Sequence, residues 1–373
     1  MCNKNIRVIF MKLKFPDVNT KFIYSLAAIL FLGALVLLVI FSGNYFGKKN
    51  IKTIVVSEEE TIQADKRPCE FPRLLDGMCV DSLDETNPKL VAIMIENHVD
   101  ARPQSGLAKA SIVYEAPVEA NYTRFMAIFP INTEVVAKVG PVRSARPYYL
   151  DWLREYGQDI MYMHVGGSPD ALSILRANNS IFNFDQFFNG PYFWRSTDRY
   201  APHNVYTSSA NWTKAWEDKG VKENTDFKSW NFSDLENCGE NNNEICINKI
   251  TVSFLPPSYE AVWKYNTSTR KYARYQLEGR HFDQDGTAIE ADTVIVQKVN
   301  SEVLDGYGRL KIDTIGSGEA IVFQNGYKEE GTWRKDSTTG RTEWLDLAGQ
   351  PMSLKPGKIW IEVVNQRGDA KWE

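Results

Sequence analysis

Residues 90–97 read LVAIMIEN, and residues 123–130 read TRFMAIFP. Both are short and almost continuously apolar, which is typical of strands buried on both faces. A third stretch of this kind, DIMYMHV, covers residues 159–165. These three stretches predict the central strands of a sheet.

Helical patterns alternate with these strands. Residues 145–157 space Tyr149 and Trp152 as one helix face does and end at a glycine, a common helix terminator. Residues 168–178 begin with Ser-Pro, a good N-cap followed by a good first residue. A last helix is predicted at 209–220. The alternation favours a layered α/β domain.

We place this α/β domain at residues 89–220. A polar connector at 221–249 follows, and then a mostly-β domain at 250–367. That last part contains short apolar runs separated by turn signals such as Asp285-Gly286 and Asn325-Gly326. The spacing of these runs is typical of a barrel or a sandwich.

An uncharged apolar segment covers residues 22–43, long enough for a transmembrane helix. Residues 1–21 carry five basic residues against one acid, so the positive-inside rule predicts a cytoplasmic tail there. Residues 44–88 are expected to form an extracytoplasmic stalk. A cleaved signal peptide is the alternative, although no A-x-A cleavage pattern follows. The apolar segment also lacks the terminal Cys of a lipoprotein signal.

The charge is divided unevenly along the chain. The 373 residues include 43 Lys and Arg and 47 Asp and Glu, a net charge of −4. Because residues 1–21 carry +4, the chain beyond the apolar segment carries −8. An acidic exterior argues against a polybasic surface for nucleic acid or anionic lipid. We predict no nucleic-acid partner and no cofactor.

The cysteines indicate an oxidising environment. Four of the five form two close pairs, Cys69 with Cys79 and Cys238 with Cys246. Local pairing into two disulfides is the simplest connectivity for an extracytoplasmic chain. A four-Cys zinc site is the alternative, but the spacing lacks the usual C-x-x-C pairs.

Polar residues that follow the predicted strands are the candidate site. Strand ends of α/β sheets line ligand crevices, and arginines match carboxylate or phosphate groups. The candidate ligand-binding residues are Asn97, Arg102, Gln104, Glu119, Arg124, Arg143, Arg146 and His203. The candidate catalytic residues are Glu96, His98, Glu119 and His164. The alternative is structural: ion pairs that tie loops together and a hydrogen-bonded core histidine.

Residues 182–206 hold nine aromatic side chains in 25 residues. Aromatic rings interleaved with polar groups suit sugar rings, and they equally suit a long loop packed over a sheet. The chain contains no standard catalytic motif such as G-x-S-x-G or H-E-x-x-H. With only four histidines, a multi-His metal site must assemble from distant segments, and we predict no metal.

Several long motifs resemble the YerB-like family of bacterial lipoproteins. They include ENHVDARPQSGL (96–107), VGPVRSARPYYLDW (139–152), HVGGSPDAL (164–172) and GTWRKDSTTGRTEWLD (331–346). The resemblance covers about 89–220 and 250–367. It implies a bacterial, envelope-facing and membrane-tethered protein, and it brings no established activity.

The sequence thus predicts a non-enzymatic binding or scaffold protein of the envelope. Its expected partners are the membrane and a cell-wall glycan, a wall peptide or an envelope protein. The alternatives are an envelope hydrolase or transferase that uses the carboxylates and histidines named above, and a purely structural spacer. Convergence of these residues on one open pocket would favour a site, whereas pairing in a closed core would favour the structural alternative.

Overall fold

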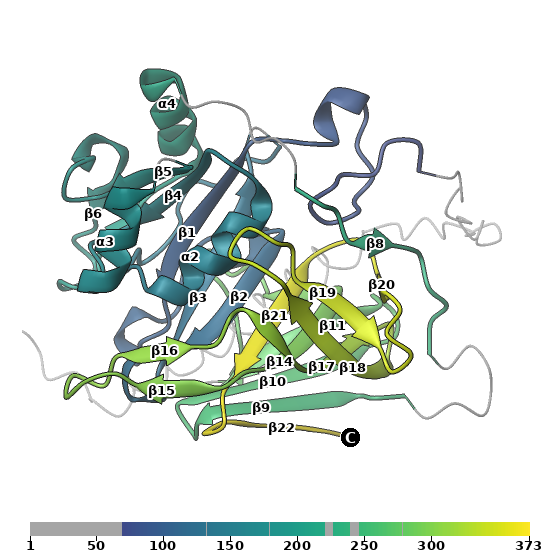
Figure 1. The fold of residues 1–373 in the computed structure, drawn as a ribbon. Coiled ribbons are helices and arrows are strands. Elements are labelled where there is room, and N and C mark those ends of the chain that lie inside the picture. The colour runs from purple at the N-terminus through teal and green to yellow at the C-terminus, as the bar shows by residue number, and fades with distance from the viewer. Residues whose placement is uncertain (1–68, 132, 179, 221–226, 239–245, 278) are drawn as a thin grey trace, which may run out of the picture. The chain divides into compact units, whose positions relative to one another are not determined.

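A ten-stranded sheet runs through the computed structural model (Figure 1). The structure describes residues 69–131, 133–178, 180–220, 227–238, 246–277 and 279–373. From one edge to the other the strands are β19 (Glu343–Asp346), β18 (Tyr327–Lys335), β17 (Gly316–Gln324), β14 (Thr293–Lys298), β21 (Ile359–Val364), β2 (Ile112–Pro117), β3 (Thr123–Pro130), β1 (Leu90–Glu96), β4 (Ile160–His164) and β5 (Ile181–Asp185).

A second sheet has six strands: β12 (Gly279–Arg280), β11 (Lys271–Gln276), β10 (Tyr259–Asn266), β9 (Lys249–Leu255), β22 (Asp369–Trp372) and β13 (Glu290–Ala291). Three smaller pairs are β15 (Ser301–Val303) with β16 (Leu310–Ile312), β20 (Ser353–Leu354) with β8 (Asn231–Phe232), and β6 (Trp194–Arg195) with β7 (Val205–Tyr206).

Three α-helices lie in the described part of the chain: α2 (Pro147–Leu153), α3 (Pro169–Ala177) and α4 (Ser209–Lys219). Each confirms a helix that the sequence predicts. The Ser168 hydroxyl accepts a hydrogen bond from the amide of Ala171 and caps α3. Gly220 ends α4 in the left-handed conformation, with φ of 58°. Local capping chemistry is therefore enough to locate these helices.

The large sheet is buried on both faces. On one face Ile93 and Val113 belong to an apolar cluster with Trp263 of β10 and Trp212 of α4. On the other face Met94 and Tyr114 pack with side chains of α2 and with the β15–β16 hairpin. This arrangement explains why the strand sequences are continuously apolar instead of alternating.

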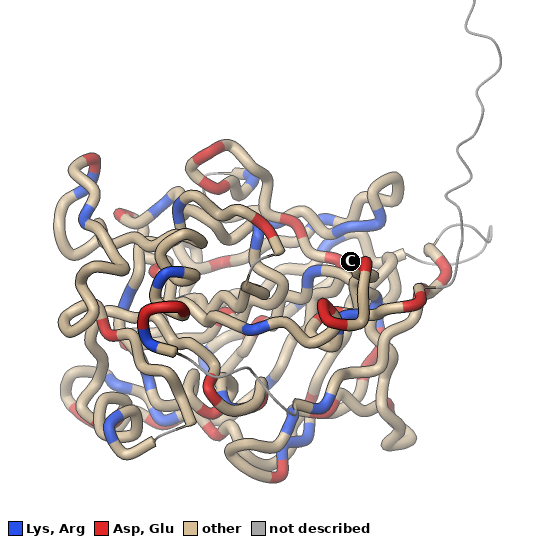
Figure 2. The backbone as a smooth tube through the Cα atoms, turned by 90° about the horizontal axis from the view of Figure 1, so that it is seen from above, with Lys and Arg blue, Asp and Glu red and all other residues tan. Residues whose placement is uncertain are grey.

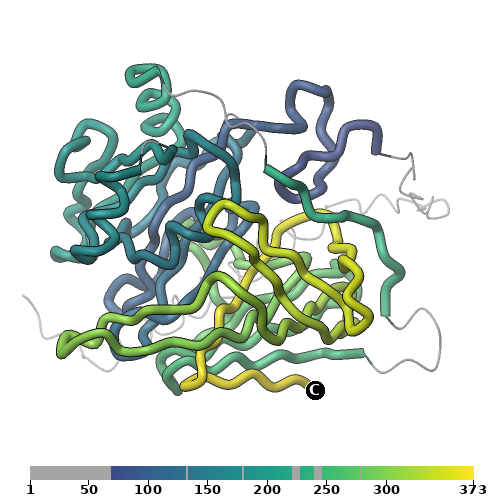
Figure 3. The backbone as a smooth tube through the Cα atoms, in the orientation of Figure 1, coloured from purple at the N-terminus to yellow at the C-terminus, as the bar shows by residue number. Residues whose placement is uncertain are grey.

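The large sheet is shared by the two halves of the chain, residues 89–220 and residues 250–367. Strand β2 pairs in parallel with β21, residue Ile112 opposite Ile359, although about 250 residues separate them. In Figure 3 the yellow segment that contains β21 accordingly lies beside the blue part of the chain. Backbone hydrogen bonding is thus continuous from β19 to β5.

The predicted fold class is wrong. An α/β layered domain requires parallel strands covered by helices, but β1 and β2 both run antiparallel to β3 between them. Among the described residues between 89 and 220, only β1, β4 and β5 form a parallel group. Strands dominate both halves, because the smaller sheet supplies much of the cover that the prediction assigned to helices.

The predicted tail at 1–21, the transmembrane helix at 22–43 and residues 44–68 of the stalk lie outside the described residues. Within the described residues, no helix is long and apolar enough to cross a membrane. Both predicted disulfides, Cys69–Cys79 and Cys238–Cys246, are confirmed.

The loop closed by the first disulfide docks onto the fold. Leu75 within it is fully buried, and the carbonyl of Asp76 accepts a hydrogen bond from the amide of Gly357 at 2.9 Å. The loop closed by this disulfide is therefore packed against the short segment that precedes β21 (Ile359–Val364).

Candidate functional site

The carboxyl ends of β1, β4 and β5 meet at one edge of the large sheet. The segment 139–145 crosses this edge and enters between β1 and β4. Its Arg143 amide donates to the carbonyl of Met94, and its carbonyl accepts from the amide of Val165. This insertion brings the predicted site residue Arg143 beside the strand ends.

Glu96, the last residue of β1, is the centre of this edge. Its carboxylate is almost fully buried and is bound on both oxygens. Arg143 donates from Nε to Oε1 at 2.8 Å, and the Nδ1 of His203 lies 2.9 Å from Oε2. A carboxylate held on both oxygens is poorly placed to remove a proton from a substrate.

His203 extends the cluster outward. Its ring stacks on the ring of His98, with centroids 5.0 Å apart and an interplanar angle of 17°. The Nδ1 of His98 accepts a hydrogen bond from the amide of Asp100. His98, Asp100 and His203 each offer one potential ligand atom, and these three atoms lie within 4.8 Å of one another. The structure thus brings together Glu96, His98, Arg143 and His203 from the predicted set.

Glu119 and Arg146 form a separate pair. Arg146 donates from Nε to a Glu119 carboxylate oxygen at 2.6 Å, which ties the turn after β2 to the start of α2. Burial acts to raise the pKa of Glu119, but the hydrogen bond and charge of Arg146 outweigh it and lower that pKa. Arg124 nearby donates to the carbonyl of Ser144. These contacts connect loops, as the structural alternative expects.

His164 lies in the core at the end of β4. Its two ring nitrogens lie 2.7 Å from the carbonyl of Gly166 and 2.6 Å from the side-chain oxygen of Asn183. Burial lowers the pKa of His164 below its usual value, and this effect outweighs the hydrogen bonds to Asn183 and Gly166, which act to raise it. The residue therefore holds the Gly166-Gly167 turn and does not open onto the edge.

A closed ring of buried hydrogen bonds contains two further predicted ligand-binding residues, Asn97 and Gln104. Gln104 donates to the Asn97 side chain at 2.9 Å, and Asn97 donates to Glu115 at 3.2 Å. Glu115 pairs with Arg274 of β11 at 2.7 Å. Arg274 donates to Nδ1 of His281, whose Nε2 lies 2.8 Å from the Gln104 oxygen and closes the ring.

Arg102 borders this ring. Its guanidinium donates to the Asn97 side-chain oxygen at 3.2 Å and to the carbonyl of Ser258 at 2.7 Å. It also lies over the ring of Tyr259, 5.2 Å from the centroid. Asn97, Arg102 and Gln104 thus face the C-terminal half of the chain, where they join the two halves.

Glu362 is a second buried carboxyl beside this ring. It lies on β21 directly opposite Glu115 on β2 and accepts a hydrogen bond from Nε1 of Trp263 at 2.7 Å. Burial, and then the nearby charge of Glu115, raises the pKa of Glu362 well above its usual value. Arg274 neutralises the charge of Glu115, and Glu362 avoids a second buried negative charge because it keeps its proton.

Sequence reasoning missed Arg274, His281 and Glu362. Arg274 occupies an inward position of a strand, and Glu362 interrupts the apolar run IWIEVV, so each breaks the polarity pattern of its element. That break is a usable signal for a buried charge. His281 has no such signal, because it stands in a turn-like sequence beside two aspartates.

The aromatic segment, residues 182–206, covers the same edge. Most of its rings are at least partly buried, as the packing alternative expects. Three stay exposed: Phe187 at 66%, Phe188 at 85% and Tyr200 at 92%. Arg199 of this segment donates to the carbonyls of Asp100 and Pro103 and so anchors it to the loop after β1.

The comparisons identify the family of this chain. Residues 77–222 match the N-terminal domain, and residues 250–361 the C-terminal domain, of a protein family of unknown function, DUF3048. The chain is 32% identical over 284 residues to "Putative lipoprotein YerB" of Bacillus subtilis, which covers 75% of this chain and 82% of that protein. The chain belongs to the YerB-like family that its motifs resemble.

The fold comparison agrees with the sequence comparison. The crystal structure of the YerB protein from Bacillus subtilis matches with a TM-score of 0.69 at 29% identity. The match covers 80% of this chain and 98% of that chain. This chain therefore has a fold similar to that of an experimentally determined relative.

Proposed function

We propose that this chain is a membrane-associated, extracytoplasmic protein of the bacterial envelope that binds a cell-wall glycan without cleaving it. The similarity to a protein named as a lipoprotein supports the location. The two disulfides support it independently, because disulfides persist in oxidising compartments.

The state of the candidate catalytic carboxylates favours binding over hydrolysis. Glycoside hydrolysis needs two carboxyl groups facing a shared substrate space, one of them able to donate a proton. Glu96 is bound by Arg143 and His203, and Glu119 is bound by Arg146. The buried pair Glu115 and Glu362 faces Arg274 inside the core, where a polymer has no access.

The three exposed rings of the aromatic segment are the observation that carries the proposal. Flat aromatic faces suit the apolar faces of sugar rings, and Phe187, Phe188 and Tyr200 are held by a segment that is itself well packed. The acidic charge of the chain beyond residue 47 disfavours anionic wall polymers, so a neutral glycan backbone is the better fit. In Figure 2 acidic and basic residues are interspersed along the tube.

The test is retention of the full chain, kept in mild detergent, on isolated peptidoglycan. The variant Phe188→Ala/Tyr200→Ala removes two exposed rings, and we expect about tenfold weaker retention or more. Tyr307→Ala is the matched control, because Tyr307 is also highly exposed but lies in the β15–β16 hairpin. Its retention should equal that of the wild type.

The soluble fraction of the same experiment is assayed for released sugar fragments. Release by the wild type would contradict the proposal and favour the hydrolase. Equal retention of the double variant and the Tyr307 variant would show that the aromatic segment is not the glycan-binding surface. Absence of wild-type retention would exclude the glycan as ligand and favour an envelope protein partner.

A further inference from the structure

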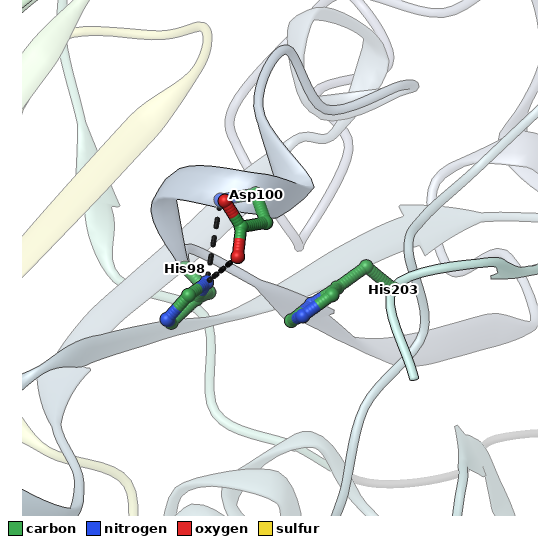
Figure 4. Close-up of side chains that lie close together, drawn as sticks. All are labelled: His98, Asp100 and His203. Atoms are coloured by element: carbon green, nitrogen blue, oxygen red, sulfur yellow. Dashed lines mark hydrogen bonds and ion pairs between the residues drawn. The ribbon is translucent and has the colours of Figure 1, made fainter. Parts of the chain in front are cut away.

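We propose that His98, Asp100 and His203 form a binding site for a divalent transition-metal ion of the zinc type (Figure 4). The two histidines lie 105 positions apart in the sequence and are brought together at the end of β1. Their potential ligand atoms and that of Asp100 lie within 4.8 Å of one another. The proposal is independent of glycan binding.

Glu96 prepares His203 as a ligand. Because the carboxylate oxygen at 2.9 Å can only accept, Nδ1 of His203 carries the proton and Nε2 keeps its lone pair. Arg143 holds the other oxygen of the same carboxylate and fixes its orientation. A carboxylate behind a histidine is the usual outer-shell partner of metal-bound imidazole.

His98 and Asp100 already have a suitable spacing. Nδ1 of His98 and Oδ2 of Asp100 are 3.4 Å apart. Two ligands about 2.0–2.1 Å from a tetrahedral zinc ion are about 3.3 Å apart. An ion bound between them would replace the 3.2 Å hydrogen bond from the Asp100 amide to His98.

One adjustment is required before three ligands can converge. The two imidazole rings are nearly parallel, as Figure 4 shows, whereas the lone pairs of bound imidazoles must point at one ion. His203 is fixed by Glu96, so the ring of His98 must turn, and the Asp100 carboxylate must move with it to keep their present spacing. The side chains of His98 and Asp100 are 34% and 69% exposed, which leaves room for this movement.

The donor set selects the kind of metal. Two imidazoles and one carboxylate suit zinc and its neighbours, whereas magnesium and calcium prefer oxygen ligands alone. The carboxylate of Asp100 supplies negative charge for the cation. The positive charge of nearby Arg143 is already balanced by Glu96. The guanidinium of Arg199 at the Asp100 carbonyl opposes binding and sets a limit on affinity. Three protein ligands leave a fourth position for water or an external ligand.

The experiment is a calorimetric titration of the untagged full chain with Zn²⁺. We expect one ion per chain with a Kd in about the micromolar range. His98→Ala or Asp100→Asn should weaken binding by about tenfold or more. Asp170→Asn is the matched control, because Asp170 is also an exposed aspartate in the first turn of a helix, and it should bind as the wild type does.

Glu96→Gln tests the positioning role of Glu96. We expect about 10–100-fold weaker binding with the stoichiometry unchanged, and an altered visible spectrum of bound Co²⁺. Circular dichroism checks that each variant is folded.

Three results would overturn the proposal. The first is that the wild type does not bind Zn²⁺ at millimolar concentration. The second is that the His98→Ala and Asp170→Asn variants bind Zn²⁺ with equal affinity. The third is that the wild type binds Mg²⁺ as tightly as Zn²⁺. The last would indicate a carboxylate site without the histidines.

Discussion

At the scale of single residues, the most consequential arrangement is the pair Glu115 and Glu362 facing Arg274. Adjacent parallel strands bring the two carboxyls to the same level between the sheets. Burying a second charge there costs more than keeping a proton, because the interior cannot solvate it. The raised pKa of Glu362 is the physical consequence.

This raised pKa predicts a pH-dependent stability. Above about pH 4.5 the folded state keeps a proton on Glu362 that the unfolded chain has lost, so stability falls as the pH rises toward the folded pKa. Glu362→Gln removes this loss while keeping an acceptor for Trp263. Its stability relative to the wild type should increase from pH 5 to pH 8, by at most about 1.4 kcal/mol per pH unit.

Urea unfolding at pH 5, 6.5 and 8 measures this difference. Glu319→Gln is the control, because it makes the same chemical change at an exposed position of β17. A difference between wild type and Glu362→Gln that stays constant over the three pH values would refute the protonated state of Glu362.

Arg274 is expected to be essential for stability. Arg274→Met keeps the length of the side chain but leaves Glu115 buried without its cation. Removing one partner of a buried ion pair costs about 3–5 kcal/mol. Arg280→Met is the control; its pair with Glu290 is partly exposed, and it should cost about 1 kcal/mol or less. Denaturant unfolding compares the two, and equal losses would contradict the assigned role.

At the scale of elements, local sequence signals locate strands and helices well. β3 matches the predicted stretch 123–130 in full, and α3 begins at the predicted Ser-Pro. The signals are local because capping groups and apolar runs act within a few residues. They do not specify pairing partners, and the antiparallel order of β1, β3 and β2 was therefore not predicted.

Gly331 provides a test of one pairing. Gly331 lies on β18, and Leu345 lies on the neighbouring strand β19. A Cβ added to Gly331 would lie 1.9 Å from the carbonyl oxygen of Leu345. Gly331→Ala should therefore separate β18 from β19 and cost about 1–3 kcal/mol or more. Gly306→Ala has open space around the added methyl group and should change stability by about 0.5 kcal/mol or less.

Hydrogen exchange locates the effect of Gly331→Ala. The amides of β18 and β19 should exchange faster, whereas those of β1 and β4 at the opposite end of the sheet should not change. Unchanged exchange in β19 would mean that the strand pair tolerates the methyl group.

At the scale of the whole molecule, the two halves cannot bury their cores independently. The apolar cluster on one face of the large sheet combines Ile93 and Phe125 from the first half with Trp263 and Trp360 from the second. The ring through Glu115 and Arg274 joins the same halves by hydrogen bonds. Separation would expose the edges of β2 and β21 together with buried charges.

This sharing predicts a single unfolding transition for residues 69–373. Tryptophan fluorescence and far-ultraviolet circular dichroism should give the same denaturant midpoint, because both halves lose their core together. The measurement is made on the full chain with both disulfides intact. Two transitions at different midpoints would contradict a shared core.

The sequence by itself was enough to predict strands β1, β3 and β4, the three helices and the two disulfide pairs, and to identify the family, since each depends on neighbouring residues or on long motifs. It also selected Glu96, His98 and His203 as candidates, but without their mutual contact. Only the tertiary structure decided that Asn97 and Gln104 join a closed ring and that two distant histidines stack. The reason is physical: a buried charge or a ligand cluster is defined by partners, and these partners lie more than 100 positions apart.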